Sequence, residues 1–342
     1  MFNASNSFGS YHRMVSRVAR ETIRQSLMLN DGTIPERMFI KIRWYMVEAV
    51  IIGDMLATLT GHSVNKRDKE SLIYLGAIMA LFDALVDDFS LPGTVVTRLL
   101  DHTFSPDGRV LSDHDTSIEN VYLLYVDKLI ATIDKEHLPG ITEHLGLIKM
   151  QMKSEEQYSK NITEESVASI TIGKGGVSAL ICSAFLQQRS ESFRSAVFEL
   201  GGLIQMMNDC QDIHKDTVDG IRTFVHFRKN FGEIAEKLDA QRRKCFALIK
   251  SLDYPEKGLS RCLFDLNAMF VVITYKLHRY AKICGYCLDF KAIAEMNRKD
   301  FRINPFSPAA VSSCFGEIMK FEYDSVEATR YEFASNYAGP DA

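Results

Sequence analysis

The chain has 342 residues, of which 46% are hydrophobic and 25% are charged, and its formal net charge is −4. Such a composition is typical of a globular protein, and a weakly acidic chain lacks the basic surface that binds nucleic acid. No apolar run approaches the ~20 residues that cross a bilayer, and residues 1–8 lack the apolar core of a signal peptide. We therefore expect a cytoplasmic protein with no nucleic-acid partner and no stable membrane insertion.

Seven cysteines are spread through the chain. This odd number fits a reducing compartment better than a disulfide framework. Cys284 and Cys287 have the spacing of a redox motif, but they lie in a helical pattern rather than after a strand, so we interpret the spacing as coincidence. No second Cys or His pair of suitable spacing lies nearby to complete a zinc site there.

Apolar residues recur every three to four positions along most of the chain, which predicts helices. In chain order these cover 12–30, 36–60, 66–89, 117–134, 142–160, 164–189, 192–217, 231–251 and 257–285. The period-two alternation of strands is nearly absent, and no proline interrupts residues 140–254. Thr163, placed before two glutamates, predicts a helix start.

No internal repeat, low-complexity tract or linker divides the sequence. We therefore predict an all-α fold in which residues 1–342 form a single domain, built as one large helical bundle with a central active-site cavity. Residues 1–10 and 337–342 are expected to be frayed.

An acidic ladder stands out inside an otherwise apolar segment. Asn208, Asp212 and Asp216 are four residues apart, so on one helix each step returns to within about 40° of the same face. Magnesium prefers oxygen ligands and usually shares them with substrate phosphates. The ladder therefore predicts a site for Mg²⁺ and a diphosphate.

A second acidic cluster, Asp83 and Asp87, also has a spacing of four and closes a long apolar run. Buried without a partner these acids would be costly, so either they bind cations or the helix end opens into a polar cavity. They would equally mark a solvated helix end before Ser90. Carboxylates facing one another across a bundle could hold several cations around one diphosphate.

The two clusters together resemble the metal motifs of the class I isoprenoid synthases, an all-α family that includes prenyl diphosphate synthases and terpene cyclases. Residues 205–212 (QMMNDCQD) resemble the prenyl synthase motif FQxxDDxxD, and residues 219–223 (DGIRT) resemble its continuation. Residues 162–165 and 173–176 are similar to that branch's LTEEEY helix and its KTG segment. Residues 208–216 also resemble the terpene-cyclase motif NDxx(S/T)xxKE.

The departures from the family pattern bear on the reaction. Asp83 and Asp87 match the outer positions of the first motif, DDxxD, with alanine at the second position. The paired arginines and the Gly-Lys-x-x-Arg loop that hold a second diphosphate in elongating synthases are not evident. The resemblance therefore implies an enzyme that ionises a single allylic diphosphate, with farnesyl diphosphate the first expectation and geranylgeranyl diphosphate or longer the next.

The resemblance also implies roles for individual residues. Metal ligands for about three Mg²⁺ ions are expected from both clusters, and lysine and arginine side chains would neutralise the diphosphate. The expected metal ligands are Asp83, Asp87, Asn208, Asp212 and Asp216. The expected catalytic residues are Asp83, Asp87, Asn208, Asp212 and Lys174. The expected diphosphate ligands are Lys174, Lys215, Arg222, Arg330 and Tyr331. Asp88 and Asp209 point elsewhere by helical spacing and are secondary candidates.

A cation formed on the substrate must be kept from water, so an apolar pocket is expected below the metal site. Helical spacing places its lining one and two turns before the acids. The expected lining residues are Leu75, Gly76, Met79, Ala80, Phe82, Gly201, Ile204 and Gln205. Gly173, Gly175 and Gly176 would weaken a helix, and a bend there would free carbonyls near the cation.

Three functions remain open from the sequence. The first is a terpene synthase that cyclises or deprotonates the cation and releases diphosphate. The second is a prenyltransferase, either chain-elongating or of the squalene and phytoene synthase kind. The third is a non-catalytic helical subunit of a prenyltransferase complex, which the alanine in the first motif and the asparagine in the second favour. A homodimer is the assembly that the resemblance implies.

Overall fold

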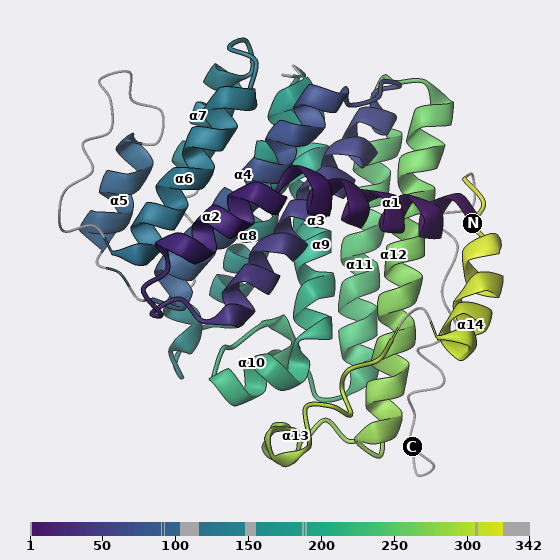
Figure 1. Cartoon of the computed structure of the whole chain (residues 1–342). Coiled ribbons are helices and arrows are strands. Elements are labelled where there is room, and N and C mark those ends of the chain that lie inside the picture. Colours follow the sequence, from purple (N-terminus) through teal and green to yellow (C-terminus); the bar gives the residue numbers. More distant parts are fainter. Residues whose placement is uncertain are drawn as a thin grey trace. The chain divides into compact units, whose positions relative to one another are not determined.

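The computed structural model describes residues 2–89, 91, 93–102, 116–147, 155–186, 188, 190–304 and 307–323. Every regular element in these residues is a helix, which confirms the all-α prediction (Figure 1). The contacts divide the chain into two compact units. The first contains residues 1–57, 62–152 and 178–188, and the second contains residues 58–61, 153–177 and 189–342. The single domain over 1–342 stays a prediction.

The first unit is built from seven helices of the described chain and the end of an eighth. These are α1 (Phe2–Val18), α2 (Arg20–Leu29), α3 (Glu36–Leu59, whose last two residues belong to the second unit), α4 (Lys66–Asp87), α5 (Gly93–His102), α6 (Ser117–Thr132) and α7 (Leu138–Leu147). The single helix expected over 12–30 is two helices, because the chain breaks at Ala19. Residues 2–10, expected to be frayed, have a helical backbone here, while 337–342 lie outside the described residues.

Helix α4 is the centre of the first unit. Its residues 72–82 are all buried, as expected of a helix that is apolar all round. The Asn65 side chain caps its start by accepting a hydrogen bond from the backbone nitrogen of Asp68. Gly76 lets α3 approach closely, because a Cβ there would lie 2.5 Å from the carbonyl oxygen of Tyr45. The apolar run therefore serves packing against α3 and α6.

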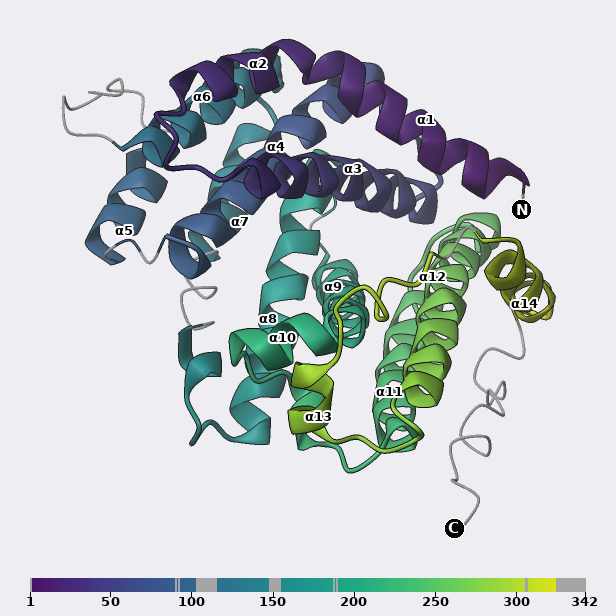
Figure 2. The same cartoon turned by 60° about the horizontal axis from the view of Figure 1, so that its bottom comes forward.

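The second unit contains the remaining helices. These are α8 (Glu164–Ser183, continuing into the first unit), α9 (Glu191–Gln211), α10 (Ile213–Asp219), α11 (Phe231–Lys250), α12 (Glu256–Ile283), α13 (Phe290–Glu295) and α14 (Pro308–Met319). Helices α9, α11 and α12 pack side by side and α14 lies against α12 (Figure 2). Thr163 caps α8 as predicted, by accepting from the backbone nitrogen of Ser166. Helices α5, α13 and α14 were not predicted.

Two predicted helices differ from the structure. The helix expected over 142–160 begins earlier, at Leu138, and α7 ends at Leu147, while residues 155–158 form a short 3₁₀ turn. The helix expected over 192–217 is interrupted at Asp212, which ends α9 and begins α10. Both differences concern helix ends, which local sequence specifies least well.

The glycines of α8 lie at its contact with α9. A Cβ on Gly175 would overlap the carbonyl oxygen of Gly201 and lie 2.7 Å from the Cβ of Gln205. A Cβ on Gly202 of α9 would in turn lie 2.7 Å from the side chain of Ile172. Helix α8 runs without interruption through these positions. Close packing of the two helices accounts for Gly175 and Gly202, and a bend at the glycines of α8 stays a prediction.

One described helix, Glu164–Leu186, is long and apolar enough by length and composition to cross a membrane. Of the 18-residue stretch that gives this helix its apolar character, 67% is buried inside the structure, as in a core helix. Length and composition alone are weak evidence of a membrane span.

All seven cysteines are free. Cys284 and Cys287 lie in one turn, where the backbone nitrogen of Cys287 donates a hydrogen bond to the carbonyl oxygen of Cys284.

Candidate functional site

The acidic ladder lies where α9 passes into α10. Asp212 is the residue at the break, but the backbone nitrogen of Asp212 still bonds to the carbonyl of Asn208, and that of Asp216 to the carbonyl of Asp212. The helical spacing of four therefore continues through the break. The side chains differ in environment: Asn208 is exposed, Asp212 is half-buried and Asp216 is buried.

Asp209 is held more firmly than the sequence suggested. Its carboxylate accepts hydrogen bonds from Gln205 (Nε2, 3.0 Å) and from the Thr171 hydroxyl (3.2 Å). Burial raises the pKa of Asp209 to about 7, against these hydrogen bonds and the positive charge of Lys174. The predicted residues Lys174 and Gln205 thus act on Asp209, which helical spacing had made only a secondary candidate.

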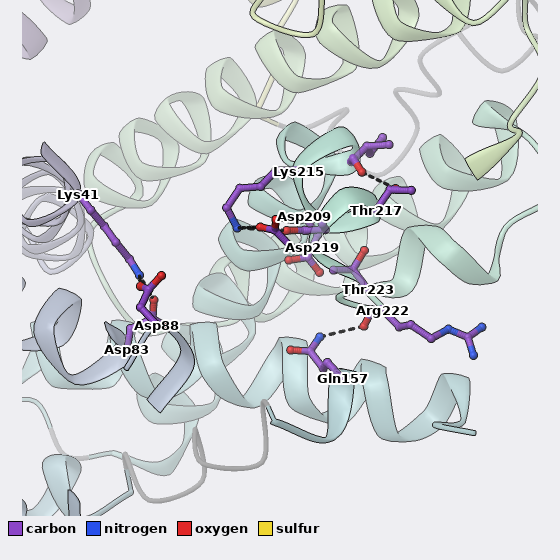
Figure 3. A network of polar contacts seen from close by, with 12 residues as sticks. Lys41, Asp83, Asp88, Gln157, Asp209, Lys215, Thr217, Asp219, Arg222 and Thr223 are labelled. Atoms are coloured by element: carbon purple, nitrogen blue, oxygen red, sulfur yellow. Dashed lines mark hydrogen bonds and ion pairs between the residues drawn. The ribbon is translucent and has the colours of Figure 1, made fainter. Parts of the chain in front are cut away.

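Asp216 is close enough to Asp209 for the two carboxylates to interact. Burial raises the pKa of Asp216 to about 8, the charge of Asp209 adds to the rise, and Lys215 opposes it. Lys215 lies 3.6 Å from Asp216 and 3.4 Å from Asp219 (Figure 3). Two buried carboxylates whose pKa values are raised are stabilised as anions by a bound cation, so the donor set fits Mg²⁺.

Beside the ladder the second unit contains a pocket of about 410 Å³. Four basic side chains line it, namely Lys215, Lys276, Arg298 and Arg302, together with Gln211, Asp212, His214, Tyr280, Phe301, Ile303 and Asn304. Burial raises the pKa of Asp212, and the charges of Lys215, Arg298 and Lys276 act against that rise. The pocket therefore joins one end of the acidic ladder to a set of cations.

The pocket is held in shape by hydrogen bonds between distant segments. The Tyr280 hydroxyl lies 3.0 Å from the Phe301 carbonyl oxygen and 3.3 Å from that of Gln211. Nε2 of His214 donates to the carbonyl of Met296 over 2.9 Å. Lys276 donates to the side-chain oxygen of Gln211. These bonds hold the segment after α13 against the ends of α9 and α12.

Sequence reasoning identified Lys215 but missed the other three basic residues of this pocket. Lys276 and Tyr280 are one helical turn apart on α12, which is a detectable spacing, but lysines are common on helix surfaces. Arg298 and Arg302 follow α13, outside every predicted helix. Only the folding of this segment against α10 and α12 identifies them.

The predicted apolar lining does not line this pocket. Gln205 bonds to Asp209, Gly201 packs against α8, and Ile204 is half-buried on α9. On α4 the remaining predicted residues lie in the core of the first unit: Leu75, Gly76, Met79, Ala80 and Phe82. None of them lines the pocket described above, and their role in lining an apolar pocket stays a prediction.

The first acidic cluster contains a lysine that the sequence did not connect with it. Nζ of Lys41 lies 2.8 Å from Asp83 and 3.0 Å from Asp88, as Figure 3 shows. The Tyr45 hydroxyl is 3.4 Å from Asp83. Burial lowers the pKa of Lys41, but the charge of Asp83 and the neighbouring groups outweigh it and raise the pKa. Asp83 therefore already has a cationic partner, and Asp88 belongs to the same cluster. The side chain of Asp87 lies outside the described part of the structure.

Arg222 is directed away from the ladder. Its guanidinium donates to the carbonyl of Lys160 over 2.8 Å and stacks on the ring of Phe227, 4.6 Å from its centroid. Figure 3 shows the side chain pointing away from Asp209 and Asp219. A role for Arg222 in diphosphate binding stays a prediction, and Arg330 and Tyr331 lie outside the described residues.

The loop after α10 is closed by His226. Gly220 ends the helix with φ of 74°, a conformation that favours glycine. The backbone nitrogen of Thr223 donates to Nδ1 of His226 (3.1 Å), so Nδ1 is unprotonated and Nε2 carries the hydrogen toward the Thr217 hydroxyl (3.1 Å). Burial lowers the pKa of His226 from 6.5 to about 4.

This arrangement predicts acid sensitivity of the loop. Between about pH 6.5 and pH 4, His226 is neutral in the folded chain but protonated in the unfolded chain. The free energy of unfolding therefore has its full value above about pH 6.5 and decreases as the pH falls toward 4. The loss over that window is about 3 kcal/mol. We expect the free energy of unfolding of His226→Gln, measured in urea at pH 7.5 and 5.0, to fall less with acidification than that of the wild type. His62→Gln, at an exposed histidine, should leave the wild-type pH dependence unchanged; equal pH slopes for the wild type and His226→Gln would contradict the prediction.

Comparisons with known proteins give a likeness of fold. No protein-family model matches the sequence, and no curated protein matches it. The structure is similar to that of a dehydrosqualene synthase in complex with ligand, with 15% identity, a TM-score of 0.48, and coverage of 82% of this chain and 98% of that chain. It is also similar to an isoprenoid synthase family member from Thermotoga neapolitana, with 15% identity, a TM-score of 0.38, and coverage of 72% and 96%.

Proposed function

We propose that the chain is a class I terpene synthase. It ionises one allylic prenyl diphosphate with Mg²⁺, cyclises or deprotonates the resulting cation, and releases diphosphate. Farnesyl diphosphate is the first expected substrate, and geranylgeranyl diphosphate or a longer one is the next. The observation that carries the proposal is the pocket of about 410 Å³ in which Asp212, at the end of the ladder, meets four basic side chains. A metal-bound diphosphate needs both kinds of group, carboxylates for the metal and cations for the phosphate oxygens.

Each group has a separate task in this mechanism. Mg²⁺, when bound, supplies positive charge that stabilises the leaving diphosphate as the carbon–oxygen bond breaks. Asp212 and Asp216 would hold the metal, with Asn208 at the exposed end of the ladder. Gln205, Thr171 and Lys174 keep the Asp209 carboxylate in place behind them. Lys276 and Arg298 would bind the phosphate oxygens, and Arg can bind two at once.

Turnover with defined substrates tests the proposal. Purified protein is incubated with Mg²⁺ and C10 to C25 prenyl diphosphates, with and without isopentenyl diphosphate, and hydrocarbons, alcohols and released diphosphate are analysed. A hydrocarbon or alcohol formed without isopentenyl diphosphate supports a terpene synthase. A longer diphosphate formed only with isopentenyl diphosphate, or a hydrocarbon joining two substrate chains, would replace it with a prenyltransferase.

The basic side of the pocket gives a specific prediction. Lys276→Ala removes a cation that lines the pocket and acts on Asp212, and we expect kcat/KM to fall by on the order of 10². Lys282→Ala removes an exposed lysine from the same helix and should stay within about twofold of the wild type. Steady-state release of diphosphate measures both, and equal activity of the two variants would count against the pocket as the diphosphate site.

One observation favours a non-catalytic subunit as the second candidate. Asp83 is already paired with Lys41, which leaves less negative charge for a metal at the first motif. A chain of this kind would show no turnover with any prenyl diphosphate and no Mg²⁺-dependent binding of diphosphate. Calorimetric titration of diphosphate with and without Mg²⁺ separates it from an active enzyme whose substrate was not among those tested.

A further inference from the structure

The first unit contains a second group of metal-ligating side chains, far from both acidic motifs along the chain. Asp68, Asp134 and His137 each offer a ligand atom, and these atoms all lie within 4.8 Å of one another. Asp68 is in the first turn of α4, fifteen residues before Asp83, which at 1.5 Å per residue is about 22 Å along the helix. The group is therefore separate from the diphosphate chemistry proposed above, and a metal bound here would not depend on that function.

Two of these side chains are buried with polar atoms that lack hydrogen bonds. Asp68 is 7% exposed and His137 is 5% exposed. Within the part of the chain that the structure describes, neither Oδ1 of Asp68 nor Nδ1 of His137 has a hydrogen-bond partner. Nε2 of His137 lies 3.5 Å from Oδ1 of Asp68, longer than an ordinary hydrogen bond. Oδ1 of Asp68, a buried carboxylate oxygen without a hydrogen bond, thus faces Nε2 of His137, and leaving that oxygen unsatisfied is costly.

The other contacts of the group hold the ligands in position. Oδ2 of Asp68 accepts from the Asn65 side chain over 2.7 Å, which leaves Oδ1 directed at His137. Arg67 pairs with Asp134 over 2.6 Å and donates to the carbonyl of Thr132 over 2.7 Å. The start of α4 is thereby joined to the end of α6, and the backbone nitrogen of His137 bonds to the carbonyl of Asp134.

The charges leave room for a cation. Asp68 and Asp134 carry two negative charges against the single positive charge of Arg67, and the exposed Glu136 adds a third carboxylate, 4.0 Å from Nε2 of His137. No other described cation is paired with these carboxylates in the structure. A divalent ion bound by Oδ1 of Asp68 and Nε2 of His137 would satisfy the buried carboxylate oxygen and neutralise the excess.

The donor types select the metal. Mg²⁺ and Ca²⁺ take oxygen ligands, whereas a mixed imidazole and carboxylate set suits Zn²⁺. We infer that Asp68, Asp134 and His137 form a zinc site that ties the start of α4 to the connection between α6 and α7.

Zinc titration of the full chain tests the inference. Protein freed of metal with EDTA is titrated with ZnCl₂ and, separately, with MgCl₂, by calorimetry. We expect saturable uptake of one Zn²⁺ at this site, with the affinity reduced by on the order of 100-fold in His137→Gln and in Asp68→Asn. His62→Gln, at an exposed histidine of the same unit, should bind as the wild type does.

Two other places in the chain could take up zinc and need their own controls. The first is the pair Cys284 and Cys287, and the second is the acidic ladder. Uptake that survives in Cys284→Ser/Cys287→Ser and in Asp212→Asn, and is lost in His137→Gln, supports the site. Uptake that is lost in either of those control variants and unchanged in His137→Gln would overturn it.

Two measurements on the wild type keep the inference falsifiable if the buried variants do not fold. Zn²⁺ added to protein already saturated with Mg²⁺ should raise the midpoint of thermal unfolding by several further degrees, because it binds only the folded state. Anomalous scattering at the zinc edge, from crystals soaked in ZnCl₂, should give a peak between Asp68 and His137. A metal-free ion pair of protonated His137 with Asp68 predicts neither, so an unchanged midpoint with no peak would refute the zinc site.

Discussion

Asp212→Asn is expected to reduce kcat/KM for the prenyl diphosphate substrate by at least about 10³. The change removes a metal ligand at the break between α9 and α10, and it removes the carboxylate that interacts with Lys215, Arg298 and Lys276. Losing a single group that stabilises developing charge costs on the order of 10²–10³, and weaker metal binding adds to this. The measurement is steady-state release of diphosphate over a range of Mg²⁺ concentrations, where the variant should need more Mg²⁺ for half-maximal rate.

Asp300→Asn provides a matched control. Asp300 is exposed, lies between the pocket residues Arg298 and Arg302 in sequence, and loses the same charge on substitution. Its activity should stay within about threefold of the wild type. If both variants lost activity equally, the negative charge of the segment as a whole, and not the ligand position of Asp212, would be responsible.

Gly175→Ala is expected to destabilise the chain by about 2–4 kcal/mol, although alanine is the better helix former by about 1 kcal/mol. The added methyl group would overlap the carbonyl oxygen of Gly201, and a backbone atom cannot move aside as a side chain can. Helices α8 and α9 would have to separate. Urea unfolding followed by circular dichroism measures the loss as a lower midpoint.

The control for this prediction is another helical glycine. Gly316 in α14 has no atom within 4 Å of the position its Cβ would take, among the described residues, and it is exposed. Gly316→Ala should therefore be neutral or stabilise the chain by up to about 1 kcal/mol. A stabilising effect of Gly175→Ala would show that α8 and α9 are packed less closely than described.

The acidic ladder shows how far local pattern reaches. A spacing of four predicts which carboxylates follow one another along a helix, and the backbone hydrogen bonds at Asp212 and Asp216 preserve that spacing. The same reasoning made Asp209 a secondary candidate, yet Gln205 and Thr171 hold it in a buried position where it interacts with Asp216. Helical spacing gives a direction around one axis. Which directions are buried depends on the helices packed there.

The apolar residues of α4 illustrate the opposite limit. Their position one and two turns before Asp83 is correct, but a position on a helix does not say whether the adjoining space is empty or filled. Gly76 packs on α3, and Ala80 and Phe82 are in the core. The pairing of Lys41 with Asp83 and Asp88 is equally invisible to local pattern, since 47 residues separate Lys41 from Asp88.

The sequence by itself determined the helical class, most helix positions, the cap at Thr163 and the order of the acidic residues, because these follow from interactions between residues a few positions apart. The tertiary structure decided which charges meet. Lys276 reaches Gln211 across 65 residues, Arg298 acts on Asp212 from beyond the last predicted helix, and His137 reaches Asp68 from the turn between α6 and α7. Coulombic and metal-ligand interactions depend on distance in space, which periodicity along the chain does not contain.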